Sequence, residues 1–349
     1  MSSLKEYVEK LNCADEAERI YAAEDLGFLN PPDGVPDLLD RLGKEPSRAV
    51  RDAIFQALIR IDADEAIEGC IRLLGSDDPQ LRNQSVEVLR RKGAASIPFL
   101  NAIMRHDSKD LRKLVLDVLS GIPASDAEEI YRAALSDNDP NVVITAVEII
   151  GKTRAEGFRN RIEDLIQADS HPMLIAACLE ALVGIGDESS LAAIRQRFPE
   201  LATLPDFLVA SCLKTIGALG SARDFAEVVS LLPVRGPHLR PAILSAIIAI
   251  YARCPSPDAD ENLLPALRAV VEDGDPPLCR YQAAKALGFL ASHEDVYSLL
   301  VSCLSSPERL VRLGAAESLR MTKRPGLDQV FAARALEESD EEVLQALAC

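Results

Sequence analysis

The chain has 349 residues, of which 55 are acidic and 38 basic, so its formal net charge is −17. Such a charge repels a phosphate backbone, so nucleic acid is not an expected partner. Hydrophobic residues make up 48% of the chain but aromatic residues only 4%, and Trp is absent. The core must therefore be built from Ala, Leu, Ile and Val, a composition that suits closely packed helices.

Membrane insertion and disulfide bonding are not expected either. The N-terminal sequence MSSLKEYVEKL has charges at amphipathic spacing, so it predicts a first helix and not a secretory signal. The longest strongly apolar run, residues 241–252, is shorter than the roughly 20 residues needed to cross a bilayer and predicts a buried helix. The eight cysteines form no CxxC pair or metal-like group, which indicates reduced thiols, a cytoplasmic protein and no metal or other cofactor.

One phrase recurs along the whole chain, most clearly in ERIYAAEDLG (18–27), CRYQAAKALG (279–288) and VRLGAAESLR (311–320). A period near 30 residues is typical of stacked units, each of which buries its apolar face only against its neighbours. We therefore predict an all-α solenoid of the armadillo/HEAT type, with about eleven helical hairpins filling residues 1–349. The first residue of each copy, here named the anchor, falls at 18, 50, 81, 111, 142, 174, 208, 239, 279, 311 and 343.

Apolar residues stand five and eight positions after the anchors, on one stripe of a helix that must face the core. This helix is the second of each hairpin, and shorter amphipathic segments upstream, such as 97–104, 130–135, 263–271 and 296–304, predict the first. The residues eight positions on are Leu26, Leu58, Leu89, Leu119, Ile150, Leu182, Ile216, Ile247, Leu287 and Leu319. Those five positions on are Ala23, Phe55, Val86, Leu116, Val147, Leu179, Leu213, Leu244, Ala284 and Ala316.

The start of each second helix is marked by a capping residue three positions before the anchor, often followed by a proline. Side-chain oxygens of Ser and Asp cap free backbone N–H groups, and proline is tolerated at the first helical position, where its missing N–H has no partner. The predicted caps are Asp15, Ser47, Asp78, Ser108, Asp139 and Asp340, and the prolines are Pro79, Pro140, Pro172, Pro237 and Pro277.

The phrase resembles HEAT repeats, specifically the short HEAT-like repeats of the phycobilisome-lyase type, whose second helix reads roughly V-R-x-x-A-A-x-A-L-G. An arginine follows the anchor in most copies and points inward, so we expect it to pair between repeats with acidic residues of the preceding turns, such as Asp77, Asp107 and Asp275. Val143, Ile175 and Val209 interrupt this row in the middle of the chain. The arginines are Arg19, Arg51, Arg82, Arg112, Arg240, Arg280 and Arg312.

Six positions after the anchor, on the side of the second helix opposite the core stripe, the first six copies carry mostly acidic residues. In solenoids that resemble this one, second helices line the concave surface, so these side chains form either an acidic row that binds a basic segment of a partner or an ordinary solvated face. The row reads Glu24, Gln56, Glu87, Asp117, Glu148 and Glu180.

The later copies are less acidic, and apolar residues two positions after the anchor favour a protein or peptide ligand there, unless they pack between adjacent helices. Six positions after the anchor these copies read Lys214, Ser245, Lys285 and Glu317, and the apolar residues are Ile144, Ala176, Ala210, Tyr281 and Leu313.

Two further segments depart from the repeat. The single long interval, between anchors 239 and 279, places about eight extra residues in segment 253–262, which is either a solvated loop or a hinge. The chain stops within the second helix of the eleventh copy, which is either a frayed cap or a cut through a longer protein. The oligomeric state, the curvature of the superhelix, the pathway and the identity of the partner are not determined by the sequence.

Signatures of catalysis are sparse. Deoxyhypusine hydroxylase is also a HEAT-like solenoid, but likeness to it requires several His-Glu pairs for a di-iron centre, and the chain has only His293-Glu294. HEAT-like DNA glycosylases use a basic face with aromatic residues, which this chain lacks. We therefore expect a non-enzymatic scaffold that binds a protein or peptide on its concave surface. The alternative is a bilin-lyase-like subunit acting on a tetrapyrrole and its acceptor protein, which rests on fold-level similarity alone.

Overall fold

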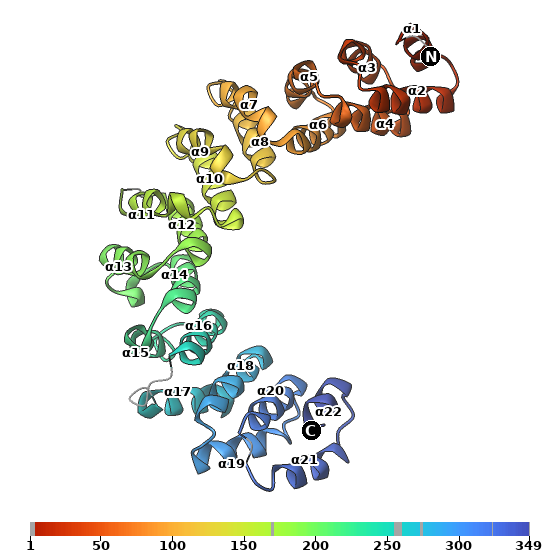
Figure 1. The fold of residues 1–349 in the computed structure, drawn as a ribbon. Helices are drawn as coiled ribbons and strands as arrows, with labels where there is room; N and C mark the ends of the chain where they lie inside the picture. The colour runs from red at the N-terminus through yellow and green to blue at the C-terminus, as the bar shows by residue number, and fades with distance from the viewer. Residues whose placement is uncertain (1–3, 169–170, 255–259, 273–274, 323, 349) are drawn as a thin grey trace. The chain divides into compact units, whose positions relative to one another are not determined.

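The computed structural model describes residues 4–168, 171–254, 260–272, 275–322 and 324–348, and within these ranges the secondary structure is helical, with no strand. The chain divides into two compact units, unit 1 (Met1–Ala155) and unit 2 (Glu156–Cys349). Within each unit, pairs of antiparallel helices stack in two layers (Figure 1). The predicted all-α solenoid is confirmed.

Unit 1 contains five hairpins, whose first helices contact one another in one layer and whose second helices do so in the other. The first helices are α1 (Leu4–Leu11), α3 (Val35–Leu42), α5 (Asp64–Leu74), α7 (Ile97–Ile103) and α9 (Glu128–Ala134). The second helices are α2 (Glu16–Leu29), α4 (Arg48–Arg60), α6 (Pro79–Lys92), α8 (Lys109–Leu119) and α10 (Pro140–Thr153).

Unit 2 continues the pattern with six hairpins among its described residues, and the second helices again contact one another in sequence. The first helices are α11 (Arg159–Ala168), α13 (Glu188–Arg197), α15 (Ala222–Ser230), α17 (Asp260–Glu272), α19 (Glu294–Cys303) and α21 (Leu327–Ala335). The second helices are α12 (Pro172–Ile185), α14 (Asp206–Leu219), α16 (Arg240–Arg253), α18 (Pro277–Leu287), α20 (Arg309–Arg320) and α22 (Glu341–Leu347).

The two predicted core rows are buried in every hairpin where they were assigned, including Leu26 and Phe55, which are fully inaccessible. All six predicted caps accept a hydrogen bond from a backbone N–H in the first turn, for example Asp78 from Gln80 at 2.8 Å. Residues that are local in sequence thus fix both the start and the buried side of each second helix.

The predicted start of one second helix is wrong. Pro237 lies in a 3-10 turn, Pro237–Leu239, and α16 begins only at Arg240. An α-helix beginning at Pro237 would need a hydrogen bond from residue 241 to the carbonyl of residue 237. Residue 241 is itself a proline without an N–H, so the α-helix starts where Pro241 falls in its first turn.

Glycines near the ends of three second helices allow each to approach the next closely. A Cβ atom on Gly27 would lie 2.7 Å from the Cα atom of Ala57, a distance that backbone atoms cannot relieve. A Cβ atom on Gly217 would likewise lie too close to Ala246, and one on Gly288 too close to Ser318. The terminal glycine of the repeated phrase is therefore a contact point for a small residue two helices later, and it sets the spacing between hairpins.

Three of the inward-pointing arginines connect successive hairpins through the residue of the following turn that stands two positions before its cap, which we name the bridging position. Arg19 illustrates the arrangement. Its Nε and Nη2 atoms donate to both carboxylate oxygens of Glu45, at 3.0 and 3.1 Å, while Nη1 donates to the carbonyls of Cys13 and Ala14 in its own turn. Arg112 and Arg312 form equivalent paired hydrogen bonds with Asp137 and Glu338 in the following turn.

This geometry confirms pairing between repeats but corrects the partners. The carboxylates come from the turn that follows each arginine, and the preceding turn supplies backbone carbonyls, such as that of Asp107 to Arg112 at 3.0 Å. Asp275 pairs with Arg240 of the previous hairpin and not with the arginine that follows it. Among the described residues, the carboxylate of Asp77 forms no ion pair. The carbonyls fill one side of the guanidinium, which leaves its outer N–H groups facing the next hairpin.

The row is interrupted by Val143, Ile175 and Val209, all buried, as predicted. In this stretch one ion pair between hairpins lies in the layer of first helices, where Arg159 binds Asp187 at 2.8 Å, and another joins second helices, where Lys214 binds Glu180 at 3.2 Å. The buried apolar side chains thus take the place of the arginines, and other residues form the ion pairs between hairpins.

The predicted loop or hinge, segment 253–262, falls largely on residues 255–259, which lie outside the described residues. The chain leaves α16 at Arg253 and re-enters a helix at Asp260. How units 1 and 2 join is not described, so a single solenoid over 1–349 stays a prediction. No helix in the described ranges is long and apolar enough to span a membrane.

Replacing Gly27 with Ala is expected to destabilise unit 1 by about 1–3 kcal/mol, because α2 and α4 must move apart at a backbone contact. Denaturant titration followed by circular dichroism measures the change. Gly157→Ala is the matched control, since a Cβ atom there meets nothing within 4 Å. Equal unfolding midpoints for the two variants would contradict a tight contact at Gly27.

Replacing Glu338 with Gln is expected to destabilise the C-terminal hairpins by about 3 kcal/mol, because the Arg312 guanidinium loses its buried anionic partner. The hydrogen bond from Arg312 lowers the pKa of Glu338 to about 2. At pH values above the ordinary carboxyl pKa of 4.5, the lowered pKa of Glu338 contributes to the stability of the fold. This contribution is lost as the pH falls towards 2. The difference in stability between wild type and Glu338→Gln should therefore shrink as the pH falls from 4.5 towards 2.

Hydrogen exchange of amides in α21 and α22 measures this change, since repeats open locally. Glu337→Gln is the control, because that side chain is 74% exposed and its ion pair with Arg334 should be worth less than about 1 kcal/mol. Unchanged protection in Glu338→Gln at neutral pH would show that the pair does not stabilise the hairpins.

Candidate binding surface

The predicted acidic row lies on consecutive second helices of unit 1, on their solvent side. Glu24 on α2, Gln56 on α4, Asp117 on α8 and Glu148 on α10 are exposed, and Glu87 on α6 is half-buried. Because α2, α4, α6, α8 and α10 contact one another in sequence, these five side chains share one face of the unit. We name it the second-helix face of unit 1. Glu180, on α12, belongs to unit 2.

Glu87 is already neutralised within its own helix. Arg91 donates to it at 2.8 Å and Arg90 at 3.0 Å, and the hydrogen bond from Arg91, followed by that from Arg90, lowers the pKa of its carboxyl group. A second N–H of Arg90 reaches the backbone carbonyl of Asp117 at 3.0 Å. A partner that bound Glu87 would have to compete with both arginines.

Glu24, Asp117 and Glu148 are different. Among the residues that the structure describes, none of these three carboxylates accepts a side-chain hydrogen bond or forms an ion pair. Neighbouring atoms partly desolvate Asp117 and raise the pKa of its carboxyl group, against the attraction of Lys113. The row predicted from sequence therefore contains three available anions, one neutralised anion and one amide.

The same helical position in unit 2 is occupied by side chains that pair with one another. Lys214 binds Glu180 at 3.2 Å, and Lys285 binds Glu317 at 2.8 Å. The hydroxyl of Tyr281, one of the predicted binding residues, also donates to Glu317, at 3.1 Å. These contacts join α12 to α14 and α18 to α20, so the charges on this face are largely balanced internally.

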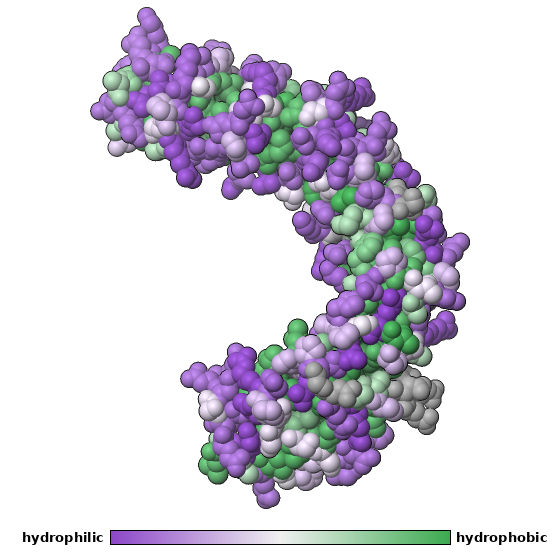
Figure 2. All heavy atoms as spheres, turned by 180° about the vertical axis from the view of Figure 1, so that it is seen from behind, coloured by the Kyte–Doolittle hydropathy of each residue, from purple (hydrophilic) through white to green (hydrophobic). Residues whose placement is uncertain are grey.

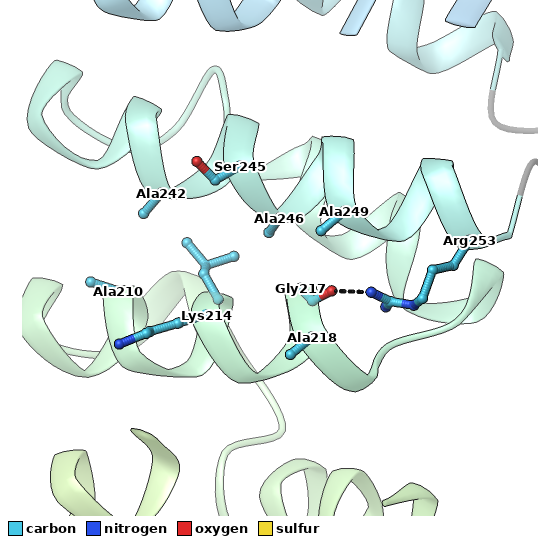
Figure 3. A pocket seen from close by; sticks show the side chains of 10 residues that line it. Ala210, Lys214, Gly217, Ala218, Ala242, Ser245, Ala246, Ala249 and Arg253 are labelled. Atoms are coloured by element: carbon cyan, nitrogen blue, oxygen red, sulfur yellow. Dashed lines mark hydrogen bonds between the residues drawn. The ribbon is translucent and has the colours of Figure 1, made fainter. Parts of the chain in front are cut away.

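An apolar groove of about 420 Å³ lies between α14 and α16 on this face of unit 2. Its walls are formed by small side chains, among them Ala210, Ala242 and Ala249, and it runs from Lys214 at one end to Arg253 at the other (Figure 3). Arg253 is held there by hydrogen bonds to the carbonyls of Gly217 and Gly220, at 2.7 and 2.8 Å. Ala210 was among the residues predicted to make this side apolar.

Large exposed hydrophobic residues one position before the anchors were missed in the sequence. Met173, Phe207 and Leu278 are 60%, 45% and 50% exposed at the starts of α12, α14 and α18. They stand seven residues before Glu180, Lys214 and Lys285, a spacing of two helical turns that places them on the same side. Counting back seven positions from the predicted row would have found them.

The remaining predicted binding residues, Ile144 and Leu313, are both half-buried, on α10 and α20. Ile144 thus belongs to unit 1, whereas Leu313 and Tyr281 occupy neighbouring second helices of unit 2. On the face of the molecule shown in Figure 2, hydrophilic side chains predominate and hydrophobic ones appear in patches between them.

No group of three or more His, Cys, Asp and Glu side chains in the described ranges is arranged to hold a metal ion. The four histidines lie in or beside turns that precede different second or first helices, and His238 binds Asp206 at 2.6 Å. The seven described cysteines form no disulfide, and five of them are buried. Burial raises the pKa of the Cys70 and Cys212 thiols to about 12, so neither is poised as a nucleophile.

The repeat pattern of the HEAT family matches residues 4–90, 97–183, 229–320 and 264–348, which together make up most of the chain. A deoxyhypusine hydroxylase from Aspergillus fumigatus is 24% identical over 239 residues, covering 66% of this chain and 70% of that protein. Of the several His-Glu pairs that likeness to that enzyme requires, this sequence contains only His293-Glu294.

Solved structures of karyopherins have a similar fold. Kap95p, in a complex with RanGDP, aligns with a TM-score of 0.66 at 12% identity, covering 99% of this chain and 54% of that chain. Kap121p bound to the extreme C-terminus of the protein phosphatase Cdc14p aligns with a TM-score of 0.56 at 12% identity, covering 99% and 45%. The chain thus spans about half the length of these structures.

Proposed function

Because the chain belongs to the HEAT-repeat family, we propose that it is a non-enzymatic scaffold that binds a partner protein or peptide along the face of its second helices. The observation that carries the proposal is the row of three available carboxylates, Glu24, Asp117 and Glu148, on the second-helix face of unit 1. The proposed partner presents a basic segment to this row.

Electrostatics supports a basic partner. A lysine or arginine that approaches Glu24, Asp117 or Glu148 displaces no internal cation, whereas one that approaches Glu87 or Glu180 must replace an existing pair. The net charge of −17 steers cationic segments towards the chain and repels nucleic acid. Exposed acidic residues on neighbouring helices therefore give both attraction over a distance and specific contacts on arrival.

The similar solved folds are consistent with this role, because Kap121p is bound in one of them to the extreme C-terminus of the protein phosphatase Cdc14p and in others to Ste12p and Pho4p. A reducing compartment such as the cytoplasm is part of the proposal, since described cysteines that form no disulfide and are mostly buried suit it. The bilin-lyase alternative stays a prediction that rests on the repeat pattern alone, and an absorbance titration with a bilin would test it.

Reversing Glu24, Asp117 and Glu148 to Lys together is expected to abolish binding of basic segments, because the row changes sign while no observed ion pair is broken. A random peptide library displayed on phage and selected on the wild-type chain should yield Lys- and Arg-rich binders. Synthetic peptides of the selected sequences then give dissociation constants for both proteins. The affinity of the variant should be lower than that of wild type by at least about tenfold.

The matched control reverses Glu9, Glu68 and Glu129, exposed residues of the first helices α1, α5 and α9, and so makes the same change in net charge on the other layer. It should bind the selected peptides nearly as tightly as wild type at 150 mM salt. Selection of peptides without basic character, or equal loss in both variants, would overturn the acidic row as the binding site.

A further inference from the structure

The turns of unit 1 that follow an inward-pointing arginine supply it with a carboxylate, from the bridging position or, at Asp78, from the cap, except the turn of His106. The side chain at the bridging position of these turns accepts a hydrogen bond from the backbone N–H of the capping residue, as Glu45 does from Ser47 and Asp137 from Asp139, both at 2.9 Å. His106 makes this bond through Nδ1, to Ser108 at 3.0 Å. A histidine keeps the turn but supplies no carboxylate to the arginine of the preceding hairpin.

That arginine is Arg82, and it lacks the partner that its equivalents have. Arg19, Arg51 and Arg112 each bind a carboxylate of the following turn. Arg82 donates from Nη1 to the carbonyl of Ser76 at 2.6 Å, and no carboxylate among the described residues lies within ion-pair distance of it. The guanidinium of Arg82 therefore has N–H groups left to donate to an incoming acceptor.

A cleft of about 510 Å³ between α6 and α8 adjoins these free N–H groups. Arg82, Ser108 and Lys113 line it, and Lys113 likewise has no ion pair within the described part of the chain. Asp110 and Asp117 line the same cleft. Two cations thus face two anions, and the two carboxylates favour an incoming group with one negative charge over a doubly charged phosphate.

We propose that this cleft binds the side-chain carboxylate of an Asp or Glu residue of a partner polypeptide, which takes the place of the carboxylate missing from the bridging position. The guanidinium of Arg82 receives it in the paired geometry that Arg112 forms with Asp137, and Lys113 adds a second cation. Asp117 borders both sites, but the acidic row is proposed to bind cations and this cleft a carboxylate, so basic and acidic peptides test the two proposals separately.

The chain's own Asp107 is the competing occupant, because it is exposed in the same turn. Its backbone carbonyl accepts from Arg112, but no described contact engages its carboxylate. Asp107→Asn distinguishes the two cases. If a partner carboxylate fills the cleft, this variant binds as wild type does, whereas displacement of Asp107 by the ligand would make the variant bind more tightly.

The test compares His106→Asp with His106→Asn in the full chain. Both side chains preserve the hydrogen bond from Ser108, but only aspartate supplies the missing anion. The probe is the peptide acetyl-Gly-Glu-Gly-amide, with acetyl-Gly-Gln-Gly-amide and inorganic phosphate as comparison arms. Binding is followed through the Nε–Hε signal of Arg82 in arginine-labelled protein, assigned with Arg82→Lys.

In wild type and His106→Asn, the glutamate peptide should shift this signal saturably, while the glutamine peptide should not and phosphate should do so more weakly. In His106→Asp the signal should already lie near that of Arg112, and affinity for the peptide should fall at least about tenfold. Unchanged titration in His106→Asp, or equal shifts with the glutamine peptide, would overturn the site. Stronger binding of phosphate would overturn the assignment to a carboxylate.

Discussion

Burial of each hairpin's apolar stripe by its neighbours is the constraint on which the rest of the structure depends. Leu26, Leu58 and their equivalents are inaccessible only because the next hairpin covers them, since a single pair of short helices has no interior of its own. The close contact of Gly27 with Ala57 shows how strictly the spacing is set. With that spacing fixed, the solvent side of every second helix falls on a common face within each unit.

The arginines add alignment to this packing. A guanidinium that donates to carbonyls of its own turn and to a carboxylate of the next one links two hairpins in one register, and a shifted register would leave a buried charge unpaired. Burial alone would raise the pKa of Glu45, but hydrogen bonds from Arg19, Ser47 and Arg41 lower it overall. Where the arginines are replaced by Val143, Ile175 and Val209, other ion pairs link neighbouring hairpins, such as Arg159 with Asp187 and Lys214 with Glu180.

The two units use one helical position for different purposes. In unit 1 the exposed carboxylates at this position are mostly unpaired, so they are available to a cationic partner. In unit 2 Glu180 and Glu317 are paired with lysines of neighbouring helices, and small apolar side chains form a groove beside them. A face whose charges are balanced internally offers shape and apolar contact, whereas one with free charges offers long-range attraction.

The features that the sequence determined by itself are local ones. Spacing alone predicted the caps, the prolines at the first helical position and the buried rows, because each depends on residues within one helix. In the same way, Glu24, Asp117 and Glu148 could be placed on one side of their helices. The delayed start of α16 is also a local feature, because Pro241 excludes an α-helix that begins at Pro237.

Contacts between hairpins were decided only by the tertiary structure. Which turn supplies the carboxylate to Arg19 or Arg112, whether Glu87 is free or bound to Arg90 and Arg91, and where a cleft opens beside Arg82 depend on distances between helices that the repeat does not encode. The physical reason is that a periodic sequence specifies the direction of each side chain from its own helix. The partner that meets it is set by the spacing and register of the neighbouring one.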